Sequence, residues 1–128
     1  MVTEMALELS PHLDSSSAAR AVTLDWAEGR DEELVFALEL VVSELVTNAV
    51  RHGAGPITLF LADTVGGIRV RVQDRGRRLP EARHPDPRSP GGRGLRVVDQ
   101  LSSEWGVERS RDGRGKTVWA VVMAPENR

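Results

Sequence analysis

Residues 44–52 read Glu-Leu-Val-Thr-Asn-Ala-Val-Arg-His, a stretch that places a carboxylate and a carboxamide one helical turn apart. At 100° per residue, Glu44 and Asn48 lie about 40° apart on a helix, at the edge of its apolar stripe. Polar groups in this position are costly to desolvate without partners, and a bound metal ion with phosphate would supply them. For an isolated motif, a pair solvated by water is the commoner explanation.

The apolar stripe beside this pair extends far upstream and predicts a long amphipathic helix. Asp31 is the expected N-cap of this helix, and Gly53 is the expected residue after its last turn. The apolar positions that repeat at helical spacing are Leu34, Leu38, Val41, Val42, Leu45 and Ala49.

Shorter elements are predicted on both sides of this helix. A strand over residues 6–9 and a helix over 18–26 precede it, and alternating runs around Gly66-Gly67 predict a hairpin after it. The remaining expected segments are an irregular, proline-rich stretch over 75–92, a helix over 95–101, and strands over 104–107 and 117–123. This order predicts a two-layer α/β sandwich rather than a doubly wound parallel sheet.

The bulk composition describes an ordinary globular protein. With 128 residues the chain is long enough for one domain with its own core, and we expect residues 1–128 to form it. The absence of cysteine excludes disulfides, thiolate metal sites and cysteine nucleophiles. The chain shows no basic leader and no apolar run long enough to cross a bilayer, so we expect a cytoplasmic protein without a membrane partner.

Charge is distributed unevenly along the chain. Residues 1–50 contain ten acidic residues and two arginines, whereas residues 75–96 contain seven arginines and two acidic residues. The basic segment would attract an anionic ligand, although a solvated arginine-rich loop is the simpler explanation. Direct nucleic-acid binding is not expected, since this segment lacks interleaved aromatic residues and the pI is about 5.9. The chain has sixteen arginines and one lysine, which is typical of a codon bias.

Two glycine-bearing motifs after the helix suggest a site for a nucleobase. Asp74 ends a predicted strand, and its carboxylate would accept a hydrogen bond from an amino group such as adenine N6. Gly76 would let the base approach the backbone. Thr117, after Gly115-Lys116, would support the base with its hydroxyl group. The simpler alternatives are a strand-ending turn and a hairpin turn.

A third motif suggests a site for phosphate. Gly92-Arg93-Gly94-Leu95 leads into the predicted helix over 95–101, where free backbone amides and a helix N-terminus together favour an anion. A simple turn is the alternative. The carbonyl group of Asn48 is a suitable ligand for Mg²⁺, which prefers oxygen donors together with phosphates and water. Glu44, one turn away, is placed to act as a general base.

The ordered set, Glu-x-x-x-Asn, Asp-x-Gly, Gly-x-Gly-Leu and Gly-x-Thr, resembles the N, G1, G2 and G3 boxes of GHKL ATP-binding domains, such as those of gyrase and histidine kinases. The resemblance covers nearly the whole chain. Residues 44–53 and the segment Gly-Lys-Thr-Val-Trp are similar to those of RsbW-type anti-sigma factor serine kinases, which are common in actinobacteria. The family implies the Bergerat fold, with a mixed, mostly antiparallel sheet and helices on one face.

The resemblance also implies a role for each motif residue. Glu44 would be the general base and Asn48 the Mg²⁺ ligand of bound ATP, while residues 77–91 would form a lid. The other implied ATP contacts are Asp74 and Gly76 at the adenine, Gly92, Arg93, Gly94 and Leu95 around the phosphates, and Thr117 behind the adenine. Arg78 departs from the family pattern, because it stands where a second glycine is frequent and it resists positive φ.

The function implied by the resemblance is that of an ATP-binding anti-sigma factor, a serine/threonine kinase that binds a sigma factor and phosphorylates a STAS-type anti-anti-sigma partner. A non-catalytic, nucleotide-dependent interaction module of the same fold is the alternative, and a free-standing ATPase is a third. A homodimer is consistent with the resemblance. A complete sensor histidine kinase is not expected, since no histidine-bearing dimerisation helix precedes the predicted ATP site.

Overall fold

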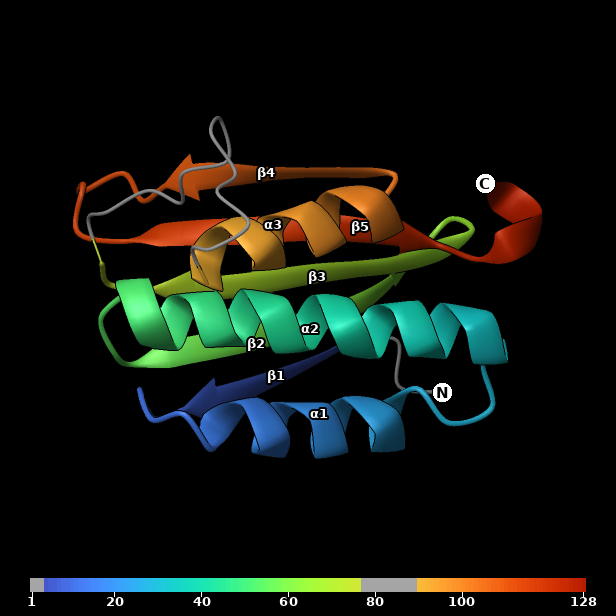
Figure 1. Cartoon of the computed structure of the whole chain (residues 1–128), viewed down its shortest axis with the longest axis horizontal. Helices are drawn as coiled ribbons and strands as arrows, with labels where there is room; N and C mark the ends of the chain where they lie inside the picture. Colours follow the sequence, from blue (N-terminus) through green and yellow to red (C-terminus); the bar gives the residue numbers. More distant parts are fainter. Residues whose placement is uncertain (1–3, 77–89) are drawn as a thin grey trace.

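The computed structural model of the chain describes residues 4–76 and 90–128, with residues 90–94 as backbone only. Strands and helices follow one another in the predicted order (Figure 1). The elements are β1 (Glu4–Leu9), α1 (Ser15–Trp26), α2 (Glu32–His52), β2 (Ile57–Thr64), β3 (Gly67–Asp74), α3 (Pro90–Leu101), β4 (Glu104–Arg109), β5 (Lys116–Met123) and a short 3₁₀ helix, η1 (Pro125–Asn127).

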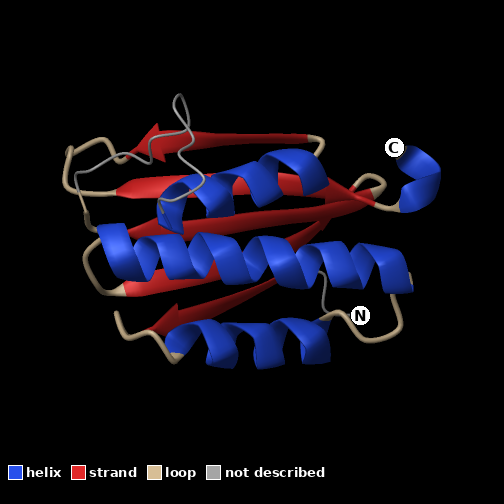
Figure 2. Ribbon diagram, in the orientation of Figure 1, coloured by secondary structure: helices blue, strands red, loops and turns tan. Residues whose placement is uncertain are grey.

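The five strands form one sheet in the order β1-β2-β3-β5-β4, and the three α-helices cover one of its faces (Figure 2). The predicted two-layer sandwich is therefore confirmed. All four ladders are antiparallel, whereas a mixed sheet was expected. The ladders β2–β3 and β4–β5 are hairpins, which can only be antiparallel. Between β1 and β2 the chain crosses the molecule twice, through α1 and α2, so β2 returns antiparallel to β1.

The core lies between the sheet and the helices and follows the alternation of the strands. Side chains that face the helices are almost fully buried, while their neighbours along each strand face the opposite side. The helix-facing residues of the three central strands are Ile57, Leu59, Leu61, Ile68, Val70, Val72, Val118, Ala120 and Val122. On the opposite face, arginines stack on aromatic rings, with Arg71 4.5 Å from the ring centre of Phe60.

The central helix α2 begins and ends where the sequence predicts. The side chain of Asp31 accepts a hydrogen bond from the backbone N–H of Leu34 at 3.0 Å, which confirms the predicted N-cap. Gly53 follows the last turn and donates its N–H to the carbonyl of Ala49. Its φ is −97°, an angle that any residue adopts. Backbone conformation is therefore not the reason for glycine at this position.

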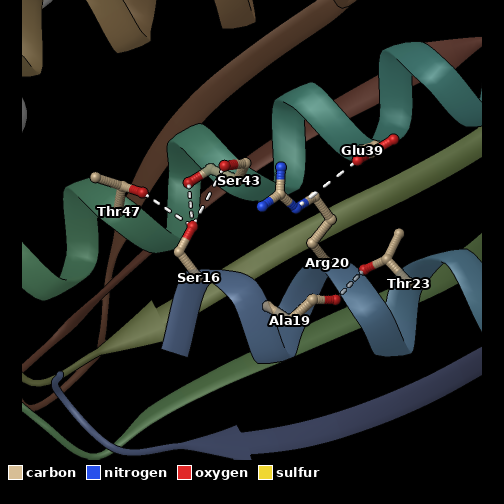
Figure 3. Close-up of polar contacts among 7 residues, drawn as sticks. All are labelled: Ser16, Ala19, Arg20, Thr23, Glu39, Ser43 and Thr47. Atoms are coloured by element: carbon tan, nitrogen blue, oxygen red, sulfur yellow. Dashed lines mark hydrogen bonds and ion pairs between the residues drawn. The ribbon is translucent and has the colours of Figure 1, made fainter. Parts of the chain in front are cut away.

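Polar contacts hold α1 against α2 (Figure 3). The hydroxyl of Ser16 lies 3.3 Å from that of Ser43 and 3.1 Å from that of Thr47, and Arg20 pairs with Glu39 on the same face of α2. Ser43 and Thr47 each precede a residue of the Glu44–Asn48 pair by one position, and one position is about 100° on a helix. Glu44 and Asn48 are therefore turned away from the face of α2 that contacts α1.

Helix α3 begins at Pro90, five residues before the predicted start. Proline suits the first turn of a helix, because the missing N–H has no partner there and the fixed φ is already helical. A glycine in a helix costs only about 1 kcal/mol relative to alanine, so Gly92 and Gly94 do not prevent helix formation. Residues 77–89 of the predicted lid, Arg78 among them, lie outside the described residues, and its last two positions, 90 and 91, belong to α3. None of the described helices is both long and apolar enough to span a membrane.

Candidate functional site

Asp74, the last residue of β3, is a buried carboxylate with an unequal set of partners. Its relative exposure is 2%. Its Oδ1 accepts a hydrogen bond from the backbone N–H of Gly76 at 2.6 Å and another from Nζ of Lys116 at 3.0 Å. Its Oδ2 is buried and has no hydrogen-bond partner among residues 4–76 and 95–128. Burial of an unpartnered carboxylate oxygen is costly, so this atom is suited to receive an N–H donor from a ligand.

Three glycines crowd around Asp74. A Cβ on Gly53 would lie 2.6 Å from Cγ of Asp74 and 2.7 Å from Oδ2, and a Cβ on Gly76 would lie 2.9 Å from Oδ1. A Cβ on Gly115 would lie 2.5 Å from the backbone oxygen of Asp74. None of the three has a positive φ, so each is glycine because space is lacking. The end of α2 and both flanking turns thus pack closely against one residue, Asp74.

The part of α2 that carries Glu44 and Asn48 lies towards the same end of the molecule as Asp74. Asn48 is 8% exposed, and Glu44 is partly exposed. Helix α3 lies along α2 in the opposite direction, so its N-terminal end lies towards the C-terminal end of α2 (Figure 1). The backbone of Gly92, Arg93 and Gly94 belongs to that end of α3, and Leu95 is buried beneath it. Fold geometry therefore gathers the predicted base, metal and phosphate residues on one side of the molecule.

Thr117 is the predicted site residue that the structure places elsewhere. It pairs with Gln73, whereas its neighbour Lys116 pairs with Asp74. Successive strand residues point to opposite faces, so Thr117 lies on the sheet face away from the helices. The role of its hydroxyl behind the adenine stays a prediction, since the register gives only the sheet face on which Thr117 lies. Lys116, which pairs with Asp74, lies on the same face of the sheet as Asp74.

Sequence reasoning missed two residues of this site, Lys116 and Gly53. Lys116 is the only lysine in a chain with sixteen arginines, and this exception to the arginine preference was the available signal. Gly53 was recognised only as the residue that ends α2. Its contact with Asp74 joins residues that are 21 positions apart, and no local pattern predicts such a contact.

A polar hollow of about 410 Å³ opens near the end of β3, and Thr58, Gln73, Asp74 and Arg114 are among its lining residues. Thr58 and Gln73 lie on the sheet face away from the helices, so the hollow reaches Asp74 from that face. At its rim, the backbone N–H of Arg114 and then the hydroxyl of Ser110 donate to Asp112, and they lower the pKa of Asp112 below its ordinary value.

Within residues 4–76 and 95–128, no group of three histidine, aspartate or glutamate side chains is arranged to hold a metal ion. A magnesium ion bound with a nucleotide does not need such a cluster, since it takes one or two protein oxygens and completes its shell with phosphates and water. The carbonyl of Asn48 is a donor of this kind. The donor set at this end of α2 therefore fits Mg²⁺ only when a phosphate ligand is also present.

Comparisons with known proteins place the fold. A search among curated proteins finds no match. Among solved structures, the chain is similar to the histidine kinase domain of the Erythrobacter litoralis EL346 blue-light activated histidine kinase, with 25% identity and a TM-score of 0.56. The match covers 87% of this chain and 60% of that domain. The whole EL346 kinase matches with 26% identity and a TM-score of 0.58, over 85% of this chain and 40% of that one.

The histidine kinase domain of the E. coli osmosensor EnvZ shares the fold at 18% identity and a TM-score of 0.50, over 98% of this chain and 91% of that domain. The sequence model of the histidine kinase-like ATPase domain matches residues 9–122, which is most of the chain. The buried carboxylate at the end of β3 and the Glu44–Asn48 helix occupy this matched region. The chain therefore belongs to the histidine kinase-like ATPase domains, the ATP-binding domains of GHKL type.

Proposed function

We propose that this domain binds ATP with Mg²⁺ and transfers a phosphoryl group to a serine of a STAS-type anti-anti-sigma partner, and that it also holds a sigma factor. The observation that carries the proposal is the buried, unpartnered Oδ2 of Asp74 at the same end of the fold as Asn48 and Glu44. An acceptor in such surroundings suits the exocyclic amine of adenine. The proposed site thus combines an acceptor for the base with groups for the phosphates.

Each remaining part of the nucleotide has a candidate contact. The side chain of Asn48 would hold Mg²⁺, and the N-terminal end of α3 would face the phosphates with its backbone N–H groups. A bound magnesium ion would neutralise charge on the phosphates. The protein's own contribution is to orient the nucleotide, through Asp74 at one end and the α2–α3 pair at the other.

Glu44 is the candidate base for phosphoryl transfer. It lies one turn before Asn48 on the same side of α2, and its partial exposure leaves it accessible to an acceptor hydroxyl. A carboxylate in this position would accept the proton of the serine hydroxyl as that oxygen attacks the phosphoryl group. Glu44 therefore acts on the transfer step, while Asn48 acts on binding.

The identity of the partner rests on sequence motifs. The segment over residues 44–53 and the segment Gly-Lys-Thr-Val-Trp are similar to those of RsbW-type kinases, which act on anti-anti-sigma proteins. The similar solved structures are histidine kinases, and their likeness supports phosphoryl transfer chemistry without identifying the acceptor.

The proposal is tested by capturing partners with the immobilised protein in the presence of Mg²⁺·ATP or Mg²⁺·ADP and then incubating each partner with labelled ATP. We expect one partner to become phosphorylated on a serine, which peptide mass spectrometry identifies, and we expect Glu44→Ala to abolish the label. Labelling of a histidine, or labelling that persists in Glu44→Ala, contradicts the proposed kinase.

Arg78 favours a second candidate, a nucleotide-dependent interaction module without catalysis. Arginine replaces a frequent glycine of the family at this position, within the predicted lid. Binding of Mg²⁺·ATP that changes partner affinity, without phosphorylation of any captured partner and without hydrolysis, favours this module over the kinase. Hydrolysis faster than partner phosphorylation would instead favour a free-standing ATPase.

A further inference from the structure

We infer that Lys116 is a positioning residue that sets the nucleobase selectivity of the site, by occupying Oδ1 of Asp74 and leaving Oδ2 as the only acceptor for the base. This inference rests on the proposed binding of ATP. The contacts around Asp74 carry it: Nζ of Lys116 lies 3.0 Å from Oδ1, while Oδ2 has no partner.

The ion pair is almost completely shielded from water. The side chain of Lys116 is 2% exposed and that of Asp74 is 1% exposed. The two residues face each other across the β3–β5 ladder, so the backbone register fixes their approach. A buried pair of charges contributes little net stability, and burying it is costly unless its geometry is good. Such a pair at a ligand site is more readily explained by ligand recognition than by stability.

The two carboxylate oxygens of Asp74 differ in their hydrogen-bond partners. Lys116 and the backbone N–H of Gly76 both donate to Oδ1. A Cβ on Gly53 would lie 2.6 Å from Cγ and 2.7 Å from Oδ2, so glycine at this position keeps a side chain away from the second oxygen. A carboxylate accepts hydrogen bonds and donates none. The free oxygen therefore accepts a purine with a 6-amino group and rejects a purine whose 6-oxo group is itself an acceptor.

The choice of lysine agrees with this role. Arginine occupies sixteen of the seventeen Lys/Arg positions in the chain. The single lysine, Lys116, is the cation that faces Asp74. A guanidinium group is planar and presents five donors in a fork, which would engage both oxygens of a carboxylate. The compact ammonium of Lys116 engages one oxygen and leaves the other for the ligand.

The test compares the binding of Mg²⁺·ATP and Mg²⁺·ITP, which carries a 6-oxo group, by calorimetry. We expect the unaltered protein to bind ATP at least about tenfold more tightly than ITP, since bound ITP would leave Oδ2 of Asp74 buried without a hydrogen-bond donor. In Lys116→Met we expect ATP affinity to fall by about tenfold or more and the ATP:ITP ratio to approach one. Arg71→Met, which removes a cation from the opposite sheet face, should change neither quantity.

Two further measurements separate selectivity from folding. Lys116→Gln keeps an N–H donor without the charge, and we expect it to retain part of the preference for ATP. Thermal melting of every variant without nucleotide reports stability alone. If Lys116→Met melts earlier but keeps the ATP:ITP ratio, the ion pair is only structural and the inference is wrong.

Binding of ATP and ITP by the unaltered protein also tests the inference, independently of the variants. Equal affinity for ATP and ITP contradicts the role of Lys116 but leaves the proposed function intact. Failure of the unaltered protein to bind either nucleotide contradicts the proposed function itself, so the two failures are distinguishable.

Discussion

Gly53 and Asp74 meet where the end of α2 reaches the end of β3, and a Cβ on Gly53 would lie 2.6 Å from Cγ of Asp74. Because the φ of Gly53 is −97°, a larger residue would adopt the backbone conformation without strain. Glycine is therefore required by the close approach of Asp74 and of the backbone oxygen of Ala49, which would lie 2.6 Å from the same Cβ. This pair couples the helix that carries Glu44 and Asn48 to the carboxylate that would read the base.

Gly53→Ala tests this coupling. The added methyl group must displace either the carboxyl group of Asp74 or the end of α2, and we expect a loss of about 1–3 kcal/mol in the free energy of unfolding. We also expect weaker ATP binding, since Oδ2 of Asp74 would move. Urea denaturation and calorimetry measure the two effects.

Gly113→Ala is the matched control for this substitution. A Cβ on Gly113 would meet nothing within 4 Å, but the φ of +69° strains any side chain. We expect it to cost about 1–2 kcal/mol of stability without changing ATP affinity. Unchanged ATP affinity in Gly53→Ala would contradict the coupling between α2 and Asp74.

Local periodicity was sufficient to predict most of the fold. The apolar spacing of α2, its cap at Asp31 and the hairpin around Gly66-Gly67 each depend on residues close in sequence, and all three are confirmed. The sequence predicts that α3 follows Gly94 and starts at residue 95, whereas the helix begins at Pro90. Pro90 shows that a helix can begin before the glycines, where its first turn needs no N–H.

Side-chain placement across the sheet was harder to predict than the elements. A shift of one residue in register moves a side chain to the other face, and the sequence alone does not give the register between β3 and β5. The Gly-x-Thr motif predicts Thr117 as a site residue, and only the register shows that Lys116 pairs with Asp74. The role of the glycines around Asp74 was equally hard to predict, since only the folded chain reveals which positions lack space for a Cβ.

Asn48→Ala is expected to weaken the binding of Mg²⁺·ATP by about tenfold to a hundredfold, because a charge-assisted contact worth about 1.5–3 kcal/mol is lost. Calorimetry with Mg²⁺ and with excess chelator measures the effect. The variant should differ from the unaltered protein only when Mg²⁺ is present. Thr47→Val, which removes only a hydroxyl that faces Ser16 on α1, is the control and should bind ATP normally. An equal loss in chelator would contradict the role of Asn48 as a metal ligand.

Asp112 is expected to titrate below its ordinary pKa of 3.8, because the N–H of Arg114 and the hydroxyl of Ser110 stabilise its charged form. A lowered folded-state pKa stabilises the β4–β5 turn above the unfolded value, and this stabilisation is lost as the pH falls through the folded value. The chemical shift of the Arg114 amide proton should follow this transition, and Asp112→Asn should abolish it. A midpoint at or above 3.8 would show that these hydrogen bonds do not persist in solution.

Glu44→Gln separates catalysis from binding in the proposed kinase. The substitution preserves the size and polarity of the side chain but removes the base, so we expect ATP affinity within about twofold of the unaltered protein. Transfer to the partner serine should fall by a factor on the order of 10²–10⁴, the usual contribution of general base catalysis. Glu39→Gln is the matched control, since Glu39 pairs with Arg20 on the α1 side of the same helix. Binding that falls as far as transfer would place Glu44 in nucleotide binding, whereas full transfer in Glu44→Gln would require another base.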